Sequence, residues 1–237
     1  MRLDQRVVDL GLTQSRSQAE SYIKLGDVRV NGQVQLKPGY AVSQHDTVEI
    51  SRRQQYVSRA ALKLASVTDI LKLDFKEKVV LDVGSSTGGF TDYALTHGAK
   101  KVIAVEVGSN QLHPSLHGHP QIELHEQTDI RDVKKLSDTP DIVVADVSFI
   151  SLRQILPHVA GLINKKTQVV AMVKPQFEAG ESSLKHKGVI KNDKMRRDIL
   201  KEFEGWSTKY FIIIDKADSG ISGAKGNQER FYLLRKT

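Results

Sequence analysis

The sequence predicts a two-domain α/β protein, in which a small N-terminal α+β unit precedes a larger and mostly parallel sheet covered by helices. Three observations predict this organisation. Short elements separated by glycine turns fill the first fifty residues, a polar stretch follows them, and apolar strands then alternate with amphipathic helices up to the end. Such alternation is typical of parallel sheets with helices on both faces. We therefore expect one domain at residues 1–50, a linker at 51–58 and a second domain at 59–237.

The composition is that of an ordinary globular chain with a basic surface. Of the 237 residues, 39% are hydrophobic, and 35 Lys and Arg against 28 Asp and Glu give a net charge of +7. This excess favours an anionic partner, with nucleic acid as the leading candidate. The absence of cysteine excludes disulfides, thiolate metal sites and cysteine nucleophiles. Neither a secretion signal nor a membrane-spanning apolar run is visible, so we expect a cytoplasmic protein.

Glycines divide the N-terminal domain into its elements. A first apolar helical repeat begins at Leu3 and stops at Gly11, and a second one, opened by a serine-rich segment, stops at Gly26. Strand-like segments then flank Asn31–Gly32, a dipeptide typical of the type I′ turn of a β-hairpin. The segment 47–50 forms the last strand expected in this domain.

The N-terminal domain also carries sequence segments that point to RNA. It contains SRSQAESYIKLGDVRVNG, followed by KPG and by a VEI strand. These segments resemble the RNA-binding domain first described in ribosomal protein S4, whose members present a basic helix-and-hairpin surface to structured RNA. Without the resemblance the basic residues are simply scattered solvated charges. With it, phosphate contacts are implied for Arg2, Arg6, Arg16, Lys24 and Arg29, and Arg59 extends the set from a basic segment beyond the linker.

Seven apolar segments in the second domain are predicted to be strands, and helices fill the gaps between them. The last two strands, joined through the loop at 220–227, form a hairpin, so the pattern predicts a Rossmann-like seven-stranded sheet with an antiparallel edge. The stretch from Asp198 to Lys209 leaves little room for a long final helix. The strands are expected at 78–83, 101–107, 122–125, 141–147, 167–173, 209–214 and 230–234, and the helices at 58–72, 89–97, 110–117, 151–163 and 192–204.

A glycine-rich loop follows the first strand of this sheet. The strand VVLDV runs into GSSTGGF and a helix. Small residues let the backbone approach a ligand closely, and a helix N-terminus offers free N–H donors. Glu106 ends the second strand 22 residues after Gly84, where a carboxylate can bind a ribose diol. The combination indicates a nucleoside cofactor, although a glycine-rich turn also occurs in doubly wound domains without one.

The spacing of the loop distinguishes between nucleoside cofactors. It is G-x-x-x-G-G rather than the G-x-G-x-x-G of nicotinamide folds, and it follows Asp82 at the strand end, as in S-adenosylmethionine-dependent methyltransferases. A carboxylate at Asp82 can pair with the methionine ammonium, and Asp129 can accept from the adenine amino group. For Asp129 a helix cap is an equally good interpretation. The candidate cofactor-binding residues are Asp82, Gly84, Ser86, Gly88, Gly89, Glu106, Asp129 and Asp146.

Four charged residues form a candidate catalytic set. Asp146 and Lys174 end neighbouring strands at the carboxyl edge of the sheet, where ligands bind. Lys63 lies on the helix before the first strand, and Glu229 precedes the last strand. Considered singly, each of the four residues is more simply interpreted as a cap or a surface charge. Within RAALKL, ADVSFISL, VKPQFE and GNQERF, however, the four resemble the Lys-Asp-Lys-Glu tetrad of FtsJ-like RNA ribose 2′-O-methyltransferases.

Taken with LDVGSSTGGFTD and the N-terminal domain, the resemblance covers essentially the whole chain and extends to the TlyA (hemolysin A) family. It implies S-adenosylmethionine as the methyl donor, ribosomal RNA or ribosomal subunits as partners, and a ribose 2′-hydroxyl, that of cytidine, as the acceptor. Lys174 would act as the base, which requires its neutral form. This chemistry needs no metal.

Three other functions stay open at this point. A ribosome-assembly factor with a vestigial cofactor site would also bind RNA, but the intact tetrad argues against it. A cytolysin, which the older family name suggests, would need an export signal, a spanning segment or an amphipathic hairpin. A pseudouridine synthase would carry its aspartate in a Gly-Arg-Leu-Asp context, whereas Arg2-Leu3-Asp4 occurs only at the start of the chain.

Four histidines between residues 113 and 125 are interpreted as surface residues rather than metal ligands.

Overall fold

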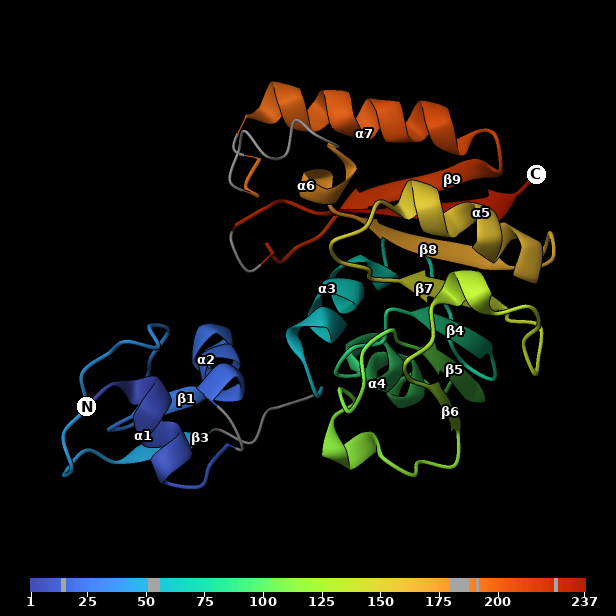
Figure 1. The fold of residues 1–237 in the computed structure, drawn as a ribbon. Helices are drawn as coiled ribbons and strands as arrows, with labels where there is room; N and C mark the ends of the chain where they lie inside the picture. Colours follow the sequence, from blue (N-terminus) through green and yellow to red (C-terminus); the bar gives the residue numbers. More distant parts are fainter. Residues whose placement is uncertain (14–15, 51–55, 180–187, 191, 224–225) are drawn as a thin grey trace. The chain divides into compact units, whose positions relative to one another are not determined.

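The computed structural model describes residues 1–13, 16–50, 56–179, 188–190, 192–223 and 226–237, so residues 51–55 of the predicted linker lie outside the described residues. The chain divides into two compact units, Met1–Arg59 and Ala60–Thr237. Each unit contains both helices and strands (Figure 1).

The N-terminal unit packs two helices against a three-stranded antiparallel sheet of order β2-β1-β3. The turn between β1 and β2 has positive φ at both Asn31 (+51°) and Gly32 (+79°), as the predicted type I′ turn requires. Leu3, Val7 and Ile23 are fully buried in the core of this unit. The elements are α1 (Leu3–Asp9), α2 (Arg16–Leu25), β1 (Val28–Val30), β2 (Gln33–Val34) and β3 (Val48–Ile50).

The second unit is built on one seven-stranded sheet of order β6-β5-β4-β7-β8-β10-β9. The pairs from β6 to β8 are parallel, whereas β10 runs antiparallel to both β8 and β9. This confirms the predicted Rossmann-like sheet with an antiparallel edge. The strand order reverses between β4 and β7, where a crevice opens at the carboxyl ends of the strands. The strands are β4 (Val79–Val83), β5 (Lys101–Val105), β6 (Ile122–His125), β7 (Ile142–Ala145), β8 (Gln168–Val173), β9 (Phe211–Asp218) and β10 (Arg230–Lys236).

Helices cover both faces of this sheet (Figure 1). Tyr232 of β10 packs in the same cluster as residues of α5 and α7. The neighbouring Phe231 instead contacts Phe90 of α4, with ring centroids 6.1 Å apart. Because successive strand residues point to opposite faces, α4 lies on the face opposite α5 and α7. The helices are α3 (Arg59–Thr68), α4 (Gly89–Thr96), α5 (Leu152–Leu162), α6 (Pro175–Glu178) and α7 (Asp193–Ser207), with 3-10 turns at Pro114–Leu116 and Ile130–Asp132.

Two of the sequence predictions were wrong. The helix expected at 110–117 is only the short turn Pro114–Leu116. Asn110 adopts a left-handed φ of +56°, and the backbone N–H groups of Asn110 and Gln111 donate to the Glu126 carboxylate, so they do not start a helix. The final helix is also longer than expected, because α7 runs to Ser207 and a turn of three residues suffices before β9.

Candidate active site

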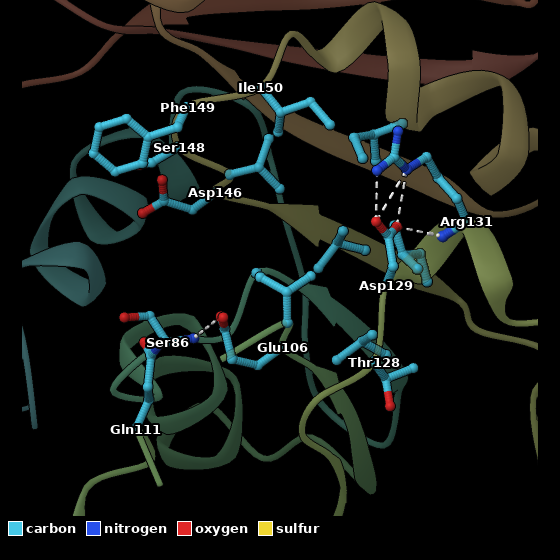
Figure 2. Close-up of a pocket in the computed structure, with 17 residues that line it drawn as sticks. Ser86, Glu106, Gln111, Thr128, Asp129, Arg131, Asp146, Ser148, Phe149 and Ile150 are labelled. Atoms are coloured by element: carbon cyan, nitrogen blue, oxygen red, sulfur yellow. Dashed lines mark hydrogen bonds and ion pairs between the residues drawn. The ribbon is translucent and has the colours of Figure 1, made fainter. Parts of the chain in front are cut away.

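A cavity of about 560 Å³ opens at the carboxyl ends of β4, β5 and β7, within the size range of small-molecule sites. Figure 2 shows its lining: Asp146 and Phe149 lie on one side, Glu106 and Ser86 on another, and Asp129 with Arg131 on a third. A second cavity of about 80 Å³ reaches Asp82 and Ser85. Gly84, Ser86 and Asp146 line both cavities, so the two adjoin.

The glycine loop comes so close to its neighbours that side chains do not fit. Gly84 has a φ of +80°, and a β-carbon there would lie 2.8 Å from the backbone oxygen of Asp146. Gly88 has a φ of +87°, and a β-carbon there would meet the side chains of Leu112 and Leu116 at 2.7 and 2.5 Å. Gly89 begins α4 and lines the smaller cavity. Gly88 therefore shapes the loop, whereas Gly84, Ser86 and Gly89 border the space for a ligand.

Substitution of Gly84 by alanine is expected to destabilise the protein by about 1–3 kcal/mol, because the new methyl group strains φ and collides with the backbone at Asp146. The matched control is Gly205→Ala inside α7, where a β-carbon meets nothing within 4 Å. That change should stabilise the helix by about 1 kcal/mol. Thermal unfolding of both variants tests the prediction, and equal shifts of the two melting temperatures would contradict it.

Glu106 lies where the sequence predicts a cofactor carboxylate. Its Oε2 accepts the backbone N–H of Ser86 at 2.9 Å, and its Oε1 accepts that of Gly108 at 2.8 Å. The side chain thereby ties the glycine loop to the segment after β5. Each carboxylate oxygen has two acceptor positions, so both oxygens keep one for a ribose diol.

Asp82 is fully buried beneath the glycine loop. Its Oδ2 accepts from the Thr91 hydroxyl at 2.7 Å, whereas its Oδ1 has no hydrogen-bond partner among the described residues. Burial, reinforced by the negative charges of Asp146 and Glu106, raises the pKa of Asp82 to about 7. Buried acceptors without a partner are rare in proteins. This one borders the smaller cavity, so a cationic donor group there would fit it.

Asp129 has the cap that one interpretation of the sequence predicts, and it lines the cavity that the other interpretation requires. It caps the turn Ile130–Asp132 by accepting the N–H of Arg131 at 2.9 Å, and it forms an ion pair with the Arg131 guanidinium at 2.6 Å. Hydrogen bonding to that guanidinium holds the pKa of Asp129 below its usual range. Asp129 also lines the larger cavity (Figure 2).

The four residues of the candidate catalytic set form two ion pairs. Lys63 Nζ lies 2.6 Å from Glu229 Oε2, and Lys174 Nζ lies 2.5 Å from Asp146 Oδ1. All four side chains are at most 16% exposed. The sheet brings them together because Arg230 pairs with Val173, which places the preceding Glu229 opposite the following Lys174. Asp146 follows β7, the other neighbour of β8.

In the N-terminal unit, two of the candidate RNA-binding residues surround one buried carboxylate. Asp4 is fully buried and pairs with Arg2 at 2.9 Å and Arg16 at 2.8 Å, while both arginine side chains stay about half exposed. Hydrogen bonding to Arg2, followed by Arg16, lowers the pKa of Asp4 to about 2. These two arginines are therefore oriented by the fold and are not free solvated charges.

The other candidate RNA-binding residues lie on different elements. Arg6 donates to the backbone oxygen of Gln44 at 3.4 Å, and the exposed Arg29 donates to that of Gly32 at 2.9 Å. Arg59 begins α3 and is half-buried. Lys24 lies on α2, and its side chain is outside the described residues.

Comparison with known families follows the same division of the chain. Residues 1–48 match the S4 domain, and residues 56–236 match the FtsJ-like methyltransferase family. The chain belongs to the FtsJ-like methyltransferase family. The resemblance inferred from the glycine loop, the tetrad and the N-terminal segments is thereby confirmed.

Relatives of this FtsJ-like methyltransferase carry two kinds of name. Hemolysin A of Brachyspira hyodysenteriae is 37% identical over 233 residues, which cover 97% of each chain. The 16S/23S rRNA (cytidine-2'-O)-methyltransferase TlyA of Mycobacterium tuberculosis is 36% identical over 239 residues, 99% of this chain and 89% of the relative. A solved Streptococcus thermophilus structure, described as a candidate hemolysin, matches with a TM-score of 0.78 at 34% identity, covering 100% of this chain and 88% of that one.

In the part of the chain that the structure describes, no helix is long and apolar enough to cross a lipid bilayer. Over the same residues, no group of three or more His, Asp or Glu side chains could hold a metal ion.

Sequence reasoning assigned no role to several residues of this FtsJ-like site. Ser148 accepts a hydrogen bond from Lys174 Nζ at 2.8 Å. Phe149 is 91% exposed with a φ of +66°, and its ring centroid lies 5.2 Å from that of Phe177. Ser148 and Phe149 both belong to the ADVSFISL motif, but the motif does not reveal which of the two side chains faces solvent. Gln111, Thr128 and Arg131 also line the larger cavity.

Proposed function

We propose that this FtsJ-like methyltransferase transfers a methyl group from S-adenosylmethionine to a ribose 2′-hydroxyl of ribosomal RNA, that of a cytidine. The observation that carries the proposal is the buried Lys174–Asp146 pair beside a cavity that the glycine loop lines. The names of the TlyA relatives support the choice of acceptor.

The residues present fit the cofactor. Glu106 and Asp129 line the larger cavity, where they would hold the ribose diol and the adenine amino group. Asp82 and the glycine loop line the smaller one, where the acceptor Oδ1 of Asp82 would take the methionine ammonium. When bound, S-adenosylmethionine supplies a methyl group on a positively charged sulfur, which leaves as a neutral thioether.

The tetrad then has distinct tasks in this proposal. Lys174, as the neutral amine, accepts the proton of the ribose hydroxyl. Asp146 lies against its Nζ and orients it. Lys63, held by Glu229, places a positive charge at the same sheet edge, which stabilises negative charge as it develops on the ribose oxygen. The rate gain comes from this positioning and electrostatic stabilisation.

The N-terminal unit would bind the RNA. Arg2, Arg6, Arg16 and Arg29 are available to phosphates, and we include Lys24 and Arg59 in the same contact set. Proteins recognise structured RNA mainly by its shape and by its unpaired nucleotides, whereas phosphate contacts do not depend on sequence. These residues therefore set the affinity for RNA rather than the choice of nucleotide. A ribosomal substrate implies that the protein works in the cytoplasm.

The proposal is tested by incubating the purified chain with tritiated S-adenosylmethionine and small subunits, large subunits or naked ribosomal RNA. We expect label in RNA, recovered as a 2′-O-methylated cytidine after digestion to nucleosides. If no label enters either subunit or the naked RNA, although calorimetry shows that the cofactor binds, the proposal is wrong. An RNA-binding assembly factor then becomes the better interpretation.

A further inference from the structure

Among the described residues, two polar side chains lie against the amine of Lys174, and the Phe177 ring lies farther away, with its centroid 6.0 Å from Nζ. Asp146 Oδ1 lies 2.5 Å away as the partner of an ion pair, and Ser148 Oγ accepts a hydrogen bond at 2.8 Å. An ion pair is set mainly by distance, whereas a hydrogen bond also fixes direction. The two neighbours therefore contribute differently, with charge from Asp146 and orientation from Ser148.

The N–H bonds of the Lys174 amine determine where its lone pair points. A charged lysine carries three N–H bonds, whereas the neutral amine that can act as a base carries two N–H bonds and one lone pair. One N–H is directed at Ser148 Oγ. The negative charge of Asp146 attracts the other N–H and repels the lone pair. The lone pair is thus left facing away from both groups.

We propose that Ser148 is a positioning residue, which fixes the rotation of the Lys174 amine so that its lone pair faces the ribose 2′-hydroxyl. This inference rests on the proposed function. In the reaction, the hydroxyl O–H bond breaks and its proton forms an N–H bond on Nζ, which becomes an ammonium. The electron pair left on oxygen forms the bond to the methyl carbon, and the electrons of the broken carbon–sulfur bond stay on sulfur.

The loop that carries Ser148 is held by contacts of the residues that follow it. The ring of the next residue, Phe149, packs at an angle of 50° against that of Phe177, which lies three residues after Lys174. Further along the same loop, the Ser151 hydroxyl and the N–H of Leu152 both donate to the buried carboxylate of Glu178, at 2.6 and 2.7 Å. The loop after β7 and the turn after β8 are therefore joined at several points. Figure 2 shows Asp146, Ser148 and Phe149 on one side of the cavity.

The decisive variant is Ser148→Ala. We expect kcat for methyl transfer to fall by about twofold to tenfold, the range for losing a hydrogen bond between two neutral groups. The KM for RNA and the calorimetric affinity for S-adenosylmethionine should stay near the wild-type values. Ser148→Thr keeps the hydroxyl and should recover most of the rate. This variant tests the inference even if the alanine variant folds poorly.

Ser151→Ala is the matched control, because it removes a hydroxyl from the same loop without touching Lys174. Ser151 caps α5 and contacts Glu178, so its loss should lower the melting temperature. The Leu152 N–H and the Phe149–Phe177 contact still hold the loop in that variant, so kcat should stay near the wild-type value. The inference is overturned if Ser148→Ala keeps the wild-type kcat, if threonine fails to rescue, or if Ser151→Ala loses as much rate. A wild-type protein that binds the cofactor but methylates no RNA would overturn the proposed function itself.

Discussion

Replacing Lys174 by alanine is expected to lower kcat for RNA methylation by about 10²- to 10⁴-fold, the usual contribution of a general base. The ammonium is almost buried between Asp146 and Ser148, and Lys174 lines neither of the two cavities assigned to the cofactor. The affinity for S-adenosylmethionine should therefore change little. Single-turnover methylation and cofactor calorimetry on the same variant measure the two quantities separately.

The sharper control is Lys174→Arg. A guanidinium keeps the positive charge beside Asp146 but is not deprotonated in proteins, so it cannot act as a base. We expect this variant to be nearly as inactive as the alanine variant. Substantial activity in the arginine variant would show that the positive charge is what matters. A parallel loss of cofactor binding would assign Lys174 to the binding site or to the fold.

The fold of the second unit was predictable because its strands are short apolar runs that end in charged residues. β7, for example, is buried at all four of its residues and ends directly before Asp146. The errors arose where local contacts override the pattern. The Glu126 carboxylate draws backbone N–H groups away from a helix at 110–117. The short helix α6 had no periodicity to reveal it, since Pro175 starts it and it lasts four residues.

The candidate site was only partly visible in the sequence. Asp146 and Lys174 could be placed together because they end neighbouring parallel strands. The Lys63–Glu229 pair needed β10 to lie between β8 and β9, and spacing in the sequence does not reveal that strand order. The exposure of Phe149 and the burial of Asp4 depend on tertiary packing as well. Hydrogen bonding across 26 residues, as between Ser148 and Lys174, has no sequence signature.

The buried carboxylate of Asp82 makes cofactor affinity depend on pH. In the free protein burial raises its pKa to about 7, and the ammonium of S-adenosylmethionine would lower that pKa by favouring the charged form. The complex then binds fewer protons than its components, so acid opposes binding. Between about pH 7 and about pH 5 the affinity should fall roughly 50-fold, approaching one decade for each pH unit.

Calorimetry of the RNA-free protein across that range measures the effect directly. The amino group of the cofactor stays mostly protonated there, because an α-amino group has a pKa of about 7.7–8.0. Asp82→Asn removes the titrating group and the negative charge, so it should bind weakly at pH 7 with little further loss in acid. Buffers with different ionisation enthalpies should show close to one proton released per cofactor bound near pH 6. A wild-type affinity that is flat with pH would mean that no ammonium reaches the unpartnered oxygen of Asp82, and the cofactor would have to bind in another orientation.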